Sequence, residues 1–318
     1  MMHTPKTFSP LDIEREVAAE KIRRRCSTFP PEAVERIFRY GAIVGHCMEH
    51  LEQVPRGMDL ARQRIRQAEE ANRSFASGTV ILADAMMQSR GRFQRQWHAP
   101  RGGLWMTVVL VNTLLPENSL LIPMAAGAAS CETLLACGIA ARIKWVNDVM
   151  VDNKKISGIL TETFTGPCSG EEYILVGIGI NVNNSEFPAG LAGLATSVKS
   201  CLGRELCVAD LAVVLLAKLR WNFGLLYDDE ARHLETHGGI GRESALAAEK
   251  RPAEHLLLQS YRSMTDAVNR RVRFGFDVVQ NPLFEANVVA IDSSGGLVLE
   301  LDDSSRTVQH SGEIIYLD

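Results

Sequence analysis

The order of short apolar segments and turn signals is the feature that most constrains the fold of this chain. Between residues 78 and 182, five segments are short, apolar and bounded by turn-forming residues, as buried strands are. They are 78–83, 104–111, 142–145, 155–163 and 173–182. Residues 120–137 are rich in alanine, which lets a helix pack closely on a sheet. With further helices expected at 59–72 and from Asp210, the pattern predicts an α+β domain.

The pattern changes at Arg270. From there on, short alternating segments are separated by turn signals such as Asn281-Pro282 and Ser294-Gly295-Gly296, and five such strands in about 50 residues predict a small β-barrel. The predicted divisions are a helical N-terminal extension at 1–40, a main domain at 41–234, an insertion with a linking helix at 235–268, and the barrel at 269–318.

Residues 11–40 are charged and helical in character, and Pro30-Pro31 can begin a second short helix. A DNA-reading helix-turn-helix would need three packed helices, and the segment offers few apolar positions for them. We therefore expect a solvated extension or a partner-binding arm without DNA binding.

Composition narrows the class of protein. The net charge of −4 argues against a non-specific nucleic-acid binder, which carries a basic excess. The seven cysteines are odd in number and form no C-x-x-C pair, so neither a disulfide framework nor a metal-binding cluster is expected. The start of the chain does not resemble a secretory signal, and no uncharged apolar stretch approaches the ~20 residues that span a bilayer. These features predict a cytoplasmic protein without a membrane partner.

The first segment that indicates ligand binding is Ser89-Arg90-Gly91-Arg92-Phe93-Gln94-Arg95-Gln96-Trp97. Arginine forks bind phosphate oxygens, the glycine lets the backbone turn or approach a ligand, and an indole face can cover a purine. The alternative is a solvated basic loop.

Two later segments add to this. Lys144 stands at the end of a predicted strand, in the segment Lys144-Trp145-Val146-Asn147-Asp148. At this position its charge can neutralise a carboxylate or a phosphate. The alternative is a strand-end lysine that reaches solvent. The strand Gly177-Ile178-Gly179-Ile180-Asn181 has two glycines, which weaken a strand unless something approaches its backbone closely.

In this order and spacing, the segments resemble the biotin–protein ligase family of the biotin/lipoate ligase superfamily. That family carries G-R-G-R-x-G-R-x-W, then K-W-P-N-D, then K-x-x-G-I-L, then G-x-G-I-N, and the resemblance covers about residues 41–318. It implies a class II synthetase-like mixed sheet with helices, followed by an SH3-like barrel. It also implies that ATP and an acid form an acyl-adenylate, biotinyl-AMP in the family, whose acyl group passes to a lysine of a carrier protein.

The resemblance also assigns roles to residues. Lys144 would lie at the acid carboxylate and the adenylate linkage, and Arg92 beside it in catalysis. Residues expected to bind the substrate or the adenylate are Arg90, Gly91, Arg95, Trp97, Asn147, Asp148, Gly158, Gly177, Gly179 and Asn181. Mg²⁺ is expected with ATP rather than on a metal site of the protein's own, because the leaving pyrophosphate needs charge compensation. Homodimers are common in the family.

The acid-binding part of the pattern departs from the family. Arg56-Gly57 replaces a Ser-Thr pair that contacts the biotin ureido ring, and Met86 stands in the place of a glutamine, with Gln88 two residues away. Unpaired ureido groups cost about 1–3 kcal/mol each. Three hypotheses follow: a biotin ligase whose ureido contacts come from Gln88 and backbone groups, a ligase for an acid with an anionic or apolar head, or a non-catalytic module that binds an adenylate or a carrier.

Overall fold

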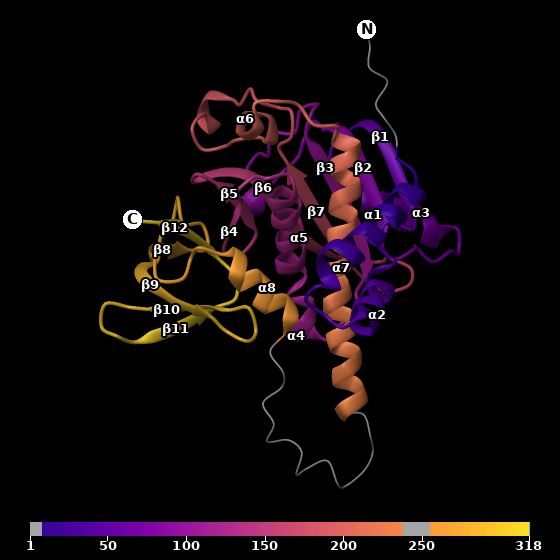
Figure 1. Cartoon of the computed structure of the whole chain (residues 1–318). Helices are drawn as coiled ribbons and strands as arrows, with labels where there is room; N and C mark the ends of the chain where they lie inside the picture. The colour runs from indigo at the N-terminus through magenta and orange to yellow at the C-terminus, as the bar shows by residue number, and fades with distance from the viewer. Residues whose placement is uncertain (1–7, 238–254, 318) are drawn as a thin grey trace.

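The computed structural model describes residues 8–237 and 255–317 and shows two β-sheets joined through helices (Figure 1). The larger sheet has seven strands in the order β1-β2-β3-β7-β6-β5-β4. β1 and β2 are parallel and the other neighbours are antiparallel, so the sheet is mixed as expected. Its strands are β1 (Met48–Val54), β2 (Thr79–Met86), β3 (Leu104–Val111), β4 (Arg142–Lys144), β5 (Asp148–Val151), β6 (Lys154–Thr165) and β7 (Glu172–Ile180).

All five strands predicted between residues 78 and 182 are present, and β5 is an additional one. Asp152 and Asn153, predicted to form a turn, have φ angles of 48° and 60° and connect β5 to β6. Two consecutive positive φ angles are typical of the tight hairpin turn whose twist matches its strands. Asn147 lies in the turn that connects β4 to β5.

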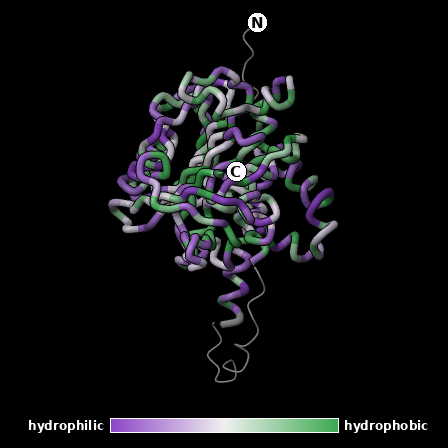
Figure 2. Tube along the Cα trace, turned by 90° about the vertical axis from the view of Figure 1, so that its left-hand side faces the viewer, coloured by the Kyte–Doolittle hydropathy of each residue, from purple (hydrophilic) through white to green (hydrophobic). Residues whose placement is uncertain are grey.

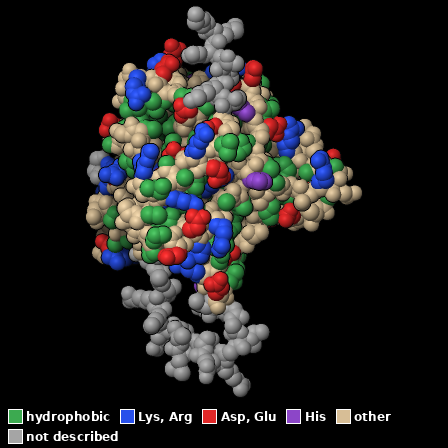
Figure 3. Space-filling view, turned by 45° about the vertical axis from the view of Figure 1, so that its right-hand side comes forward, with side chains coloured by type: hydrophobic (Ala, Val, Ile, Leu, Met, Phe, Trp, Pro, Cys, Tyr) green, Lys and Arg blue, Asp and Glu red, His purple; other side chains and the backbone are tan. Residues whose placement is uncertain are grey.

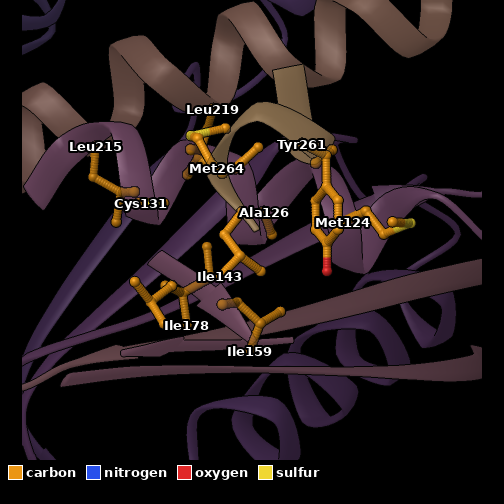
Figure 4. Packing of buried hydrophobic residues seen from close by; sticks show 14 of the residues in the cluster. Met124, Ala126, Cys131, Ile143, Ile159, Ile178, Leu215, Leu219, Tyr261 and Met264 are labelled. Atoms are coloured by element: carbon orange, nitrogen blue, oxygen red, sulfur yellow. The ribbon is translucent and has the colours of Figure 1, made fainter. Parts of the chain in front are cut away.

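Successive side chains along each strand point to opposite sides of the sheet, so the sheet has two different faces. On one face, Ile159 and Ile178 pack beneath α5 (Ile122–Ala136), which is in turn covered by α7 (Val208–His237) (Figure 4). On the other face, α3 (Gly57–Glu70) covers a smaller apolar cluster. That face is only partly covered, because α3 packs mainly against β2, β3 and β7.

The helix α5 matches the predicted span of 120–137 closely. Pro116–Ala136, which joins α4 (Pro116–Ser119) to α5, is long and apolar enough to cross a membrane by length and composition, although it is not uncharged, since it contains Glu117 and Glu132. However, 72% of an 18-residue window within this stretch is buried inside the protein, since α5 lies between the sheet and α7. Its apolar character is therefore explained by its position in the core.

The expectation of a solvated N-terminal extension is wrong. Helices α1 (Pro10–Glu20) and α2 (Pro31–Gly41), joined by η1 (Lys21–Arg25), lie along α7, and their side chains Ile13 and Phe38 are buried. The buried ammonium of Lys218 on α7 also donates to Glu20 Oε1 at 2.6 Å. A buried charge is tolerated only when it is paired in this way.

The second sheet lies beside the main domain and contains β8 (Arg271–Gly275), β9 (Phe284–Ile291), β10 (Leu297–Glu300), β11 (Arg306–Gln309) and β12 (Glu313–Tyr316). The strands are antiparallel in the order β11-β10-β9-β8-β12. The predicted five strands are thus present. The expected barrel closure is not seen, because β11 and β12 do not pair with each other in the part of the chain that the structure describes.

Helices connect the two sheets. The short elements η3 (Ala189–Leu191) and α6 (Val198–Leu202) precede α7, which continues past the predicted division at residue 234 and ends in a hydrophilic turn that projects from the body (Figure 2). α8 (Leu256–Met264) forms the first part of the predicted helix at 256–268. The remaining part of the predicted insertion, 238–254, lies outside the described residues. On the face seen in Figure 3, basic and acidic side chains are interspersed.

The packing of α2 can be tested by mutation. Phe38 is 3% exposed and its ring lies 5.3 Å from that of Trp221, so Phe38→Ala is expected to destabilise the protein by about 3–5 kcal/mol. Leu11→Ala is the matched control, because Leu11 on α1 is 67% exposed. Urea denaturation followed by circular dichroism measures both. Equal stability of the two variants would mean that α2 is not part of the folded core.

Candidate active site

The strand register brings one residue from each of four strands into a single row across the sheet. Lys144 on β4 pairs with Asp148 on β5, Asp148 with Gly158 on β6, and Gly158 with Gly179 on β7. Residues paired in this way point to the same face of a sheet, and neighbouring strands lie about 4.8 Å apart. The row therefore aligns the cationic end of Lys144 with a strip of bare backbone.

Glycine makes that strip. A Cβ on Gly179 would lie 2.9 Å from Cζ2 and Nε1 of Trp97, and one on Gly158 would lie 3.1 Å from Trp97 Cζ3. Two residues along β7, a Cβ on Gly177 would lie 3.1 Å from Met58 Cε. The close approach that the two strand glycines predicted is therefore confirmed: the indole of Trp97 lies flat against β6 and β7.

The segment from Ser89 to Trp97 forms a closed loop above the glycine strip, which is the floor of the site. Its ends are joined because Trp97 N donates to Ser89 O at 3.0 Å and Ser89 Oγ donates to Trp97 O at 2.7 Å. Gly91 has an ordinary φ of −93°, and the left-handed residue of the loop is Phe93 with φ 54°. Of the two roles expected of the glycine, the turn therefore falls to Phe93, and the approach to a ligand stays a prediction.

The loop and the sheet enclose a cavity of about 330 Å³, a size that suits a small ligand. It is lined by all the residues predicted to act in catalysis or to bind the substrate and the adenylate: Lys144, Arg92, Arg90, Gly91, Arg95, Trp97, Asn147, Asp148, Gly158, Gly177, Gly179 and Asn181. The interpretations of the arginine segment as a solvated loop and of Lys144 as a lysine that reaches solvent are therefore not supported.

The second sheet contributes a wall that sequence reasoning missed. Arg92 Nη1 donates to Gly312 O at 2.7 Å, and both terminal nitrogens of Arg95 lie 2.9 Å from the carboxylate of Glu313. Arg95 also pairs with Asp277, in the turn after β8. These contacts fix the arginine loop against the C-terminal sheet. The Ser311-Gly312-Glu313 sequence was the only signal for them.

The C-terminal helix and sheet also hold the turn that carries Lys144. Tyr261 on α8 donates its hydroxyl to Val146 O at 2.9 Å, and Trp145 Nε1 donates to Gly295 O at 3.2 Å. Asn147 Nδ2 donates to Ile159 O at 2.5 Å, which ties the turn to β6. Figure 4 shows Tyr261 directed from α8 toward the sheet. The turn residues thus support Lys144 structurally.

Charged side chains are concentrated within the cavity. Burial lowers the pKa of Lys144 below its ordinary value, an effect that Asp148 opposes and Lys155 reinforces. Lys155 Nζ is 2.6 Å from Asp148 Oδ1 and lies over the Trp97 ring, 5.2 Å from its centroid. Lys155, which begins the K-x-x-G pattern, was not predicted as a site residue. Together these cations are suited to hold a phosphate or carboxylate oxygen.

The end of the cavity near the start of α3 differs from what the family pattern implies. Arg56, Gly57 and Met86 line it, and Arg56 forms an ion pair with Glu162 on β6. Gln88 was a candidate for contacts to the acid, but it does not line the cavity: its side chain is exposed and its backbone N–H donates to Pro55 O at 2.8 Å. At this end, therefore, a guanidinium and a thioether replace small polar groups.

The mixed sheet and the cation-lined cavity are typical of a ligase domain, and comparisons with known proteins agree on this class. The sequence profile of the biotin/lipoate A/B protein ligase family matches residues 60–181. The bifunctional ligase/repressor BirA of Bacillus subtilis is 30% identical over 248 residues, which cover 76% of this chain and 67% of the relative. The biotin–[acetyl-CoA-carboxylase] ligase of Paracoccus denitrificans is 38% identical over 109 residues, 32% of this chain and 43% of that protein.

Among solved structures, the biotin protein ligase from Aquifex aeolicus in complex with biotin and ATP has the same fold, with a TM-score of 0.65 at 20% identity over 85% of this chain and 98% of that one. The chain belongs to the biotin/lipoate A/B protein ligase family and is an enzyme of the biotin–protein ligase type.

The glycine floor can be tested with Gly179→Ala. The added methyl would lie 2.9 Å from the Trp97 indole, so the ring should be displaced and the KM for ATP should rise by roughly tenfold or more. Gly190→Ala is the control, because nothing lies within 4 Å of the methyl it would add. Steady-state kinetics and tryptophan fluorescence measure the effect. Unchanged values for both variants would contradict the role of the floor.

Proposed function

We propose that the chain joins ATP to a carboxylic acid, biotin in the first instance, and transfers the acyl group to a lysine of a carrier protein. In the first step a carboxylate oxygen attacks the α-phosphorus of ATP and pyrophosphate leaves, which gives biotinyl-AMP. In the second step a lysine amine attacks the acyl carbon, AMP leaves and the amine loses its proton to form an amide. The observation that carries this proposal is that Lys144, the arginine loop and the glycine strands meet in one cavity.

No nucleophile of the protein is needed, because the attacking groups belong to the acid and to the carrier. The protein's part is to position these groups and to neutralise their charge. Lys144 would hold the acid carboxylate and the α-phosphate, and Arg90, Arg92 and Arg95 would hold the phosphates. Trp97 would cover the adenylate, and Asn147 and Asp148 would order the ATP end.

Mg²⁺ would accompany the ATP phosphates and offset the charge of the leaving pyrophosphate. The described residues contain no group of three or more potential metal ligands. Asp148 is a carboxylate of the cavity that could complete its coordination.

A second candidate keeps the same chemistry and changes the acid. It is favoured by Arg56, Gly57 and Met86, which line the part of the cavity where the family binds the biotin ring. The acceptor in both cases would be a lysine of a carboxyl-carrier protein. Cytoplasmic location, the absence of DNA binding and homodimer formation stay predictions.

The activity is tested by pyrophosphate exchange with purified protein, ATP, Mg²⁺ and biotin. Exchange should depend on biotin, and Lys144→Ala should lower kcat/KM by about 10²–10³-fold, the effect of removing one charge-stabilising donor. Lys154→Ala is the control, because Lys154 is exposed and does not line the cavity. No exchange at millimolar biotin would exclude biotin as the acid, and full activity of Lys144→Ala would exclude the mechanism.

The pH dependence offers an independent test. Since the pKa of Lys144 is lowered, its charge is present below that pKa and is lost as pH rises through it. The alkaline limb of kcat/KM, which reports the free enzyme, should therefore lie below 10.5, the ordinary value of lysine. Lys144→Arg should reduce activity and remove this limb, because arginine stays charged. A limb that persists in Lys144→Arg would assign it to another group.

A further inference from the structure

We propose that the far end of the cavity selects acids whose tail is uncharged and carries a hydrogen-bond acceptor, and that Arg56, held by Glu162, is the residue that selects them. The tail here means the end of the acid opposite its carboxylate. This inference rests on the proposed function and deepens it, since it specifies the class of acid that the ligase would activate.

The strand register places Arg56 at a suitable distance from Lys144. Gly158, Leu160 and Glu162 follow one another on the same face of β6, and Gly158 lies in the row that contains Lys144. Four residues of strand separate Gly158 from Glu162, which is roughly 13 Å. An acid bound with its carboxylate at Lys144 and its chain running along β6 toward Glu162 would therefore place its tail beside Arg56.

The charges around Arg56 are balanced, which argues against an anionic tail. Arg56 and Arg62 both pair with Glu162, and both reach Asp59 Oδ1, at 3.4 Å and 2.7 Å. The four formal charges cancel. Burial alone would raise the pKa of Glu162, but the hydrogen bonds from Arg62 and Arg56 hold it below its ordinary value, so the carboxylate stays ionised. An additional anion would compete with two carboxylates for the same guanidinium.

An entirely apolar tail fits no better. The side chain of Arg56 is only 14% exposed and lines the cavity. Glu162 and Arg62 do not line the cavity. A guanidinium has five N–H donors, more than the contacts to Glu162, Asp59 and Met58 Sδ at 3.3 Å require. A tail without an acceptor would remove water from such donors and give nothing in return.

The surroundings of Arg56 admit a tail of moderate size. Met58 and Met86 supply adaptable apolar walls, and Thr107 supplies a hydroxyl at the floor. Gly57 is required at the start of α3, because a Cβ there would lie 2.5 Å from Thr107 Oγ1. A carbonyl of an amide or a ureido group is the kind of acceptor that a neutralised guanidinium and these walls would accept.

The test compares chain-matched acids in pyrophosphate exchange with the unmodified protein: one with an alkyl end, one with a terminal primary amide and one with a terminal carboxylate, beside biotin. The amide or ureido acid should exceed both others in kcat/KM by roughly tenfold or more. This comparison needs no variant to fold. A preference for the dicarboxylic acid or for the alkyl acid overturns the inference, whereas no exchange with any acid overturns the proposed function itself.

Variants then test whether Glu162 neutralises Arg56 and whether Arg56 selects the tail of the acid. Glu162→Gln removes the compensating charge, so the ratio of dicarboxylic acid to amide acid should rise about tenfold. Arg56→Met should abolish the preference of amide over alkyl. Arg62→Gln is the matched control: Arg62 contacts the same two carboxylates without lining the cavity, so the amide-over-alkyl preference should persist. Unchanged preferences in both Glu162→Gln and Arg56→Met, with circular dichroism confirming folded protein, would overturn the assignment.

Discussion

The antiparallel pairing of β6 with β7 is the interaction on which the rest of the site depends. It places Gly158 opposite Gly179 and removes both side chains from one face of the sheet, where the Trp97 ring then lies. The same alternation directs Ile159 and Ile178 to the other face, into the core beneath α5. Core and cavity are thus two faces of the same strands, so that the apolar packing that stabilises the sheet also fixes the floor of the site.

The main domain does not complete the cavity by itself. Tyr261 of α8 and Gly295 of the second sheet hold the turn after Lys144, while Gly312 and Glu313 hold Arg92 and Arg95. The arginines that would bind phosphate are therefore already engaged with the C-terminal sheet. An anion that entered the cavity would meet cations that are paired and positioned, and it would exchange one set of charge-assisted hydrogen bonds for another.

The errors of the sequence interpretation have physical causes. Val34, Ile37 and Phe38 have helical spacing, but they look too few for a core until the long apolar face of α7 supplies the other half of the contact. β5 has only four residues, and its first, Asp148, is also a good turn residue. Barrel closure depends on whether the two edge strands β11 and β12, which are consecutive in the chain, pair with each other, and alternation within a strand does not encode which strands pair.

From the sequence alone, residue types at fixed spacing were enough to predict the family, the strands between residues 78 and 182 and most of the catalytic and substrate-binding side chains of the main domain. Lys155, the wall from the second sheet and the partners of the arginines became apparent only in the folded protein. Glu162 and Glu313 pair with arginines 106 and 218 residues away, and such contacts follow from strand register and sheet docking rather than from local pattern. That Met86 and not Gln88 lines the cavity also follows from the fold, since it depends on which side chain at the end of β2 is directed toward the cavity.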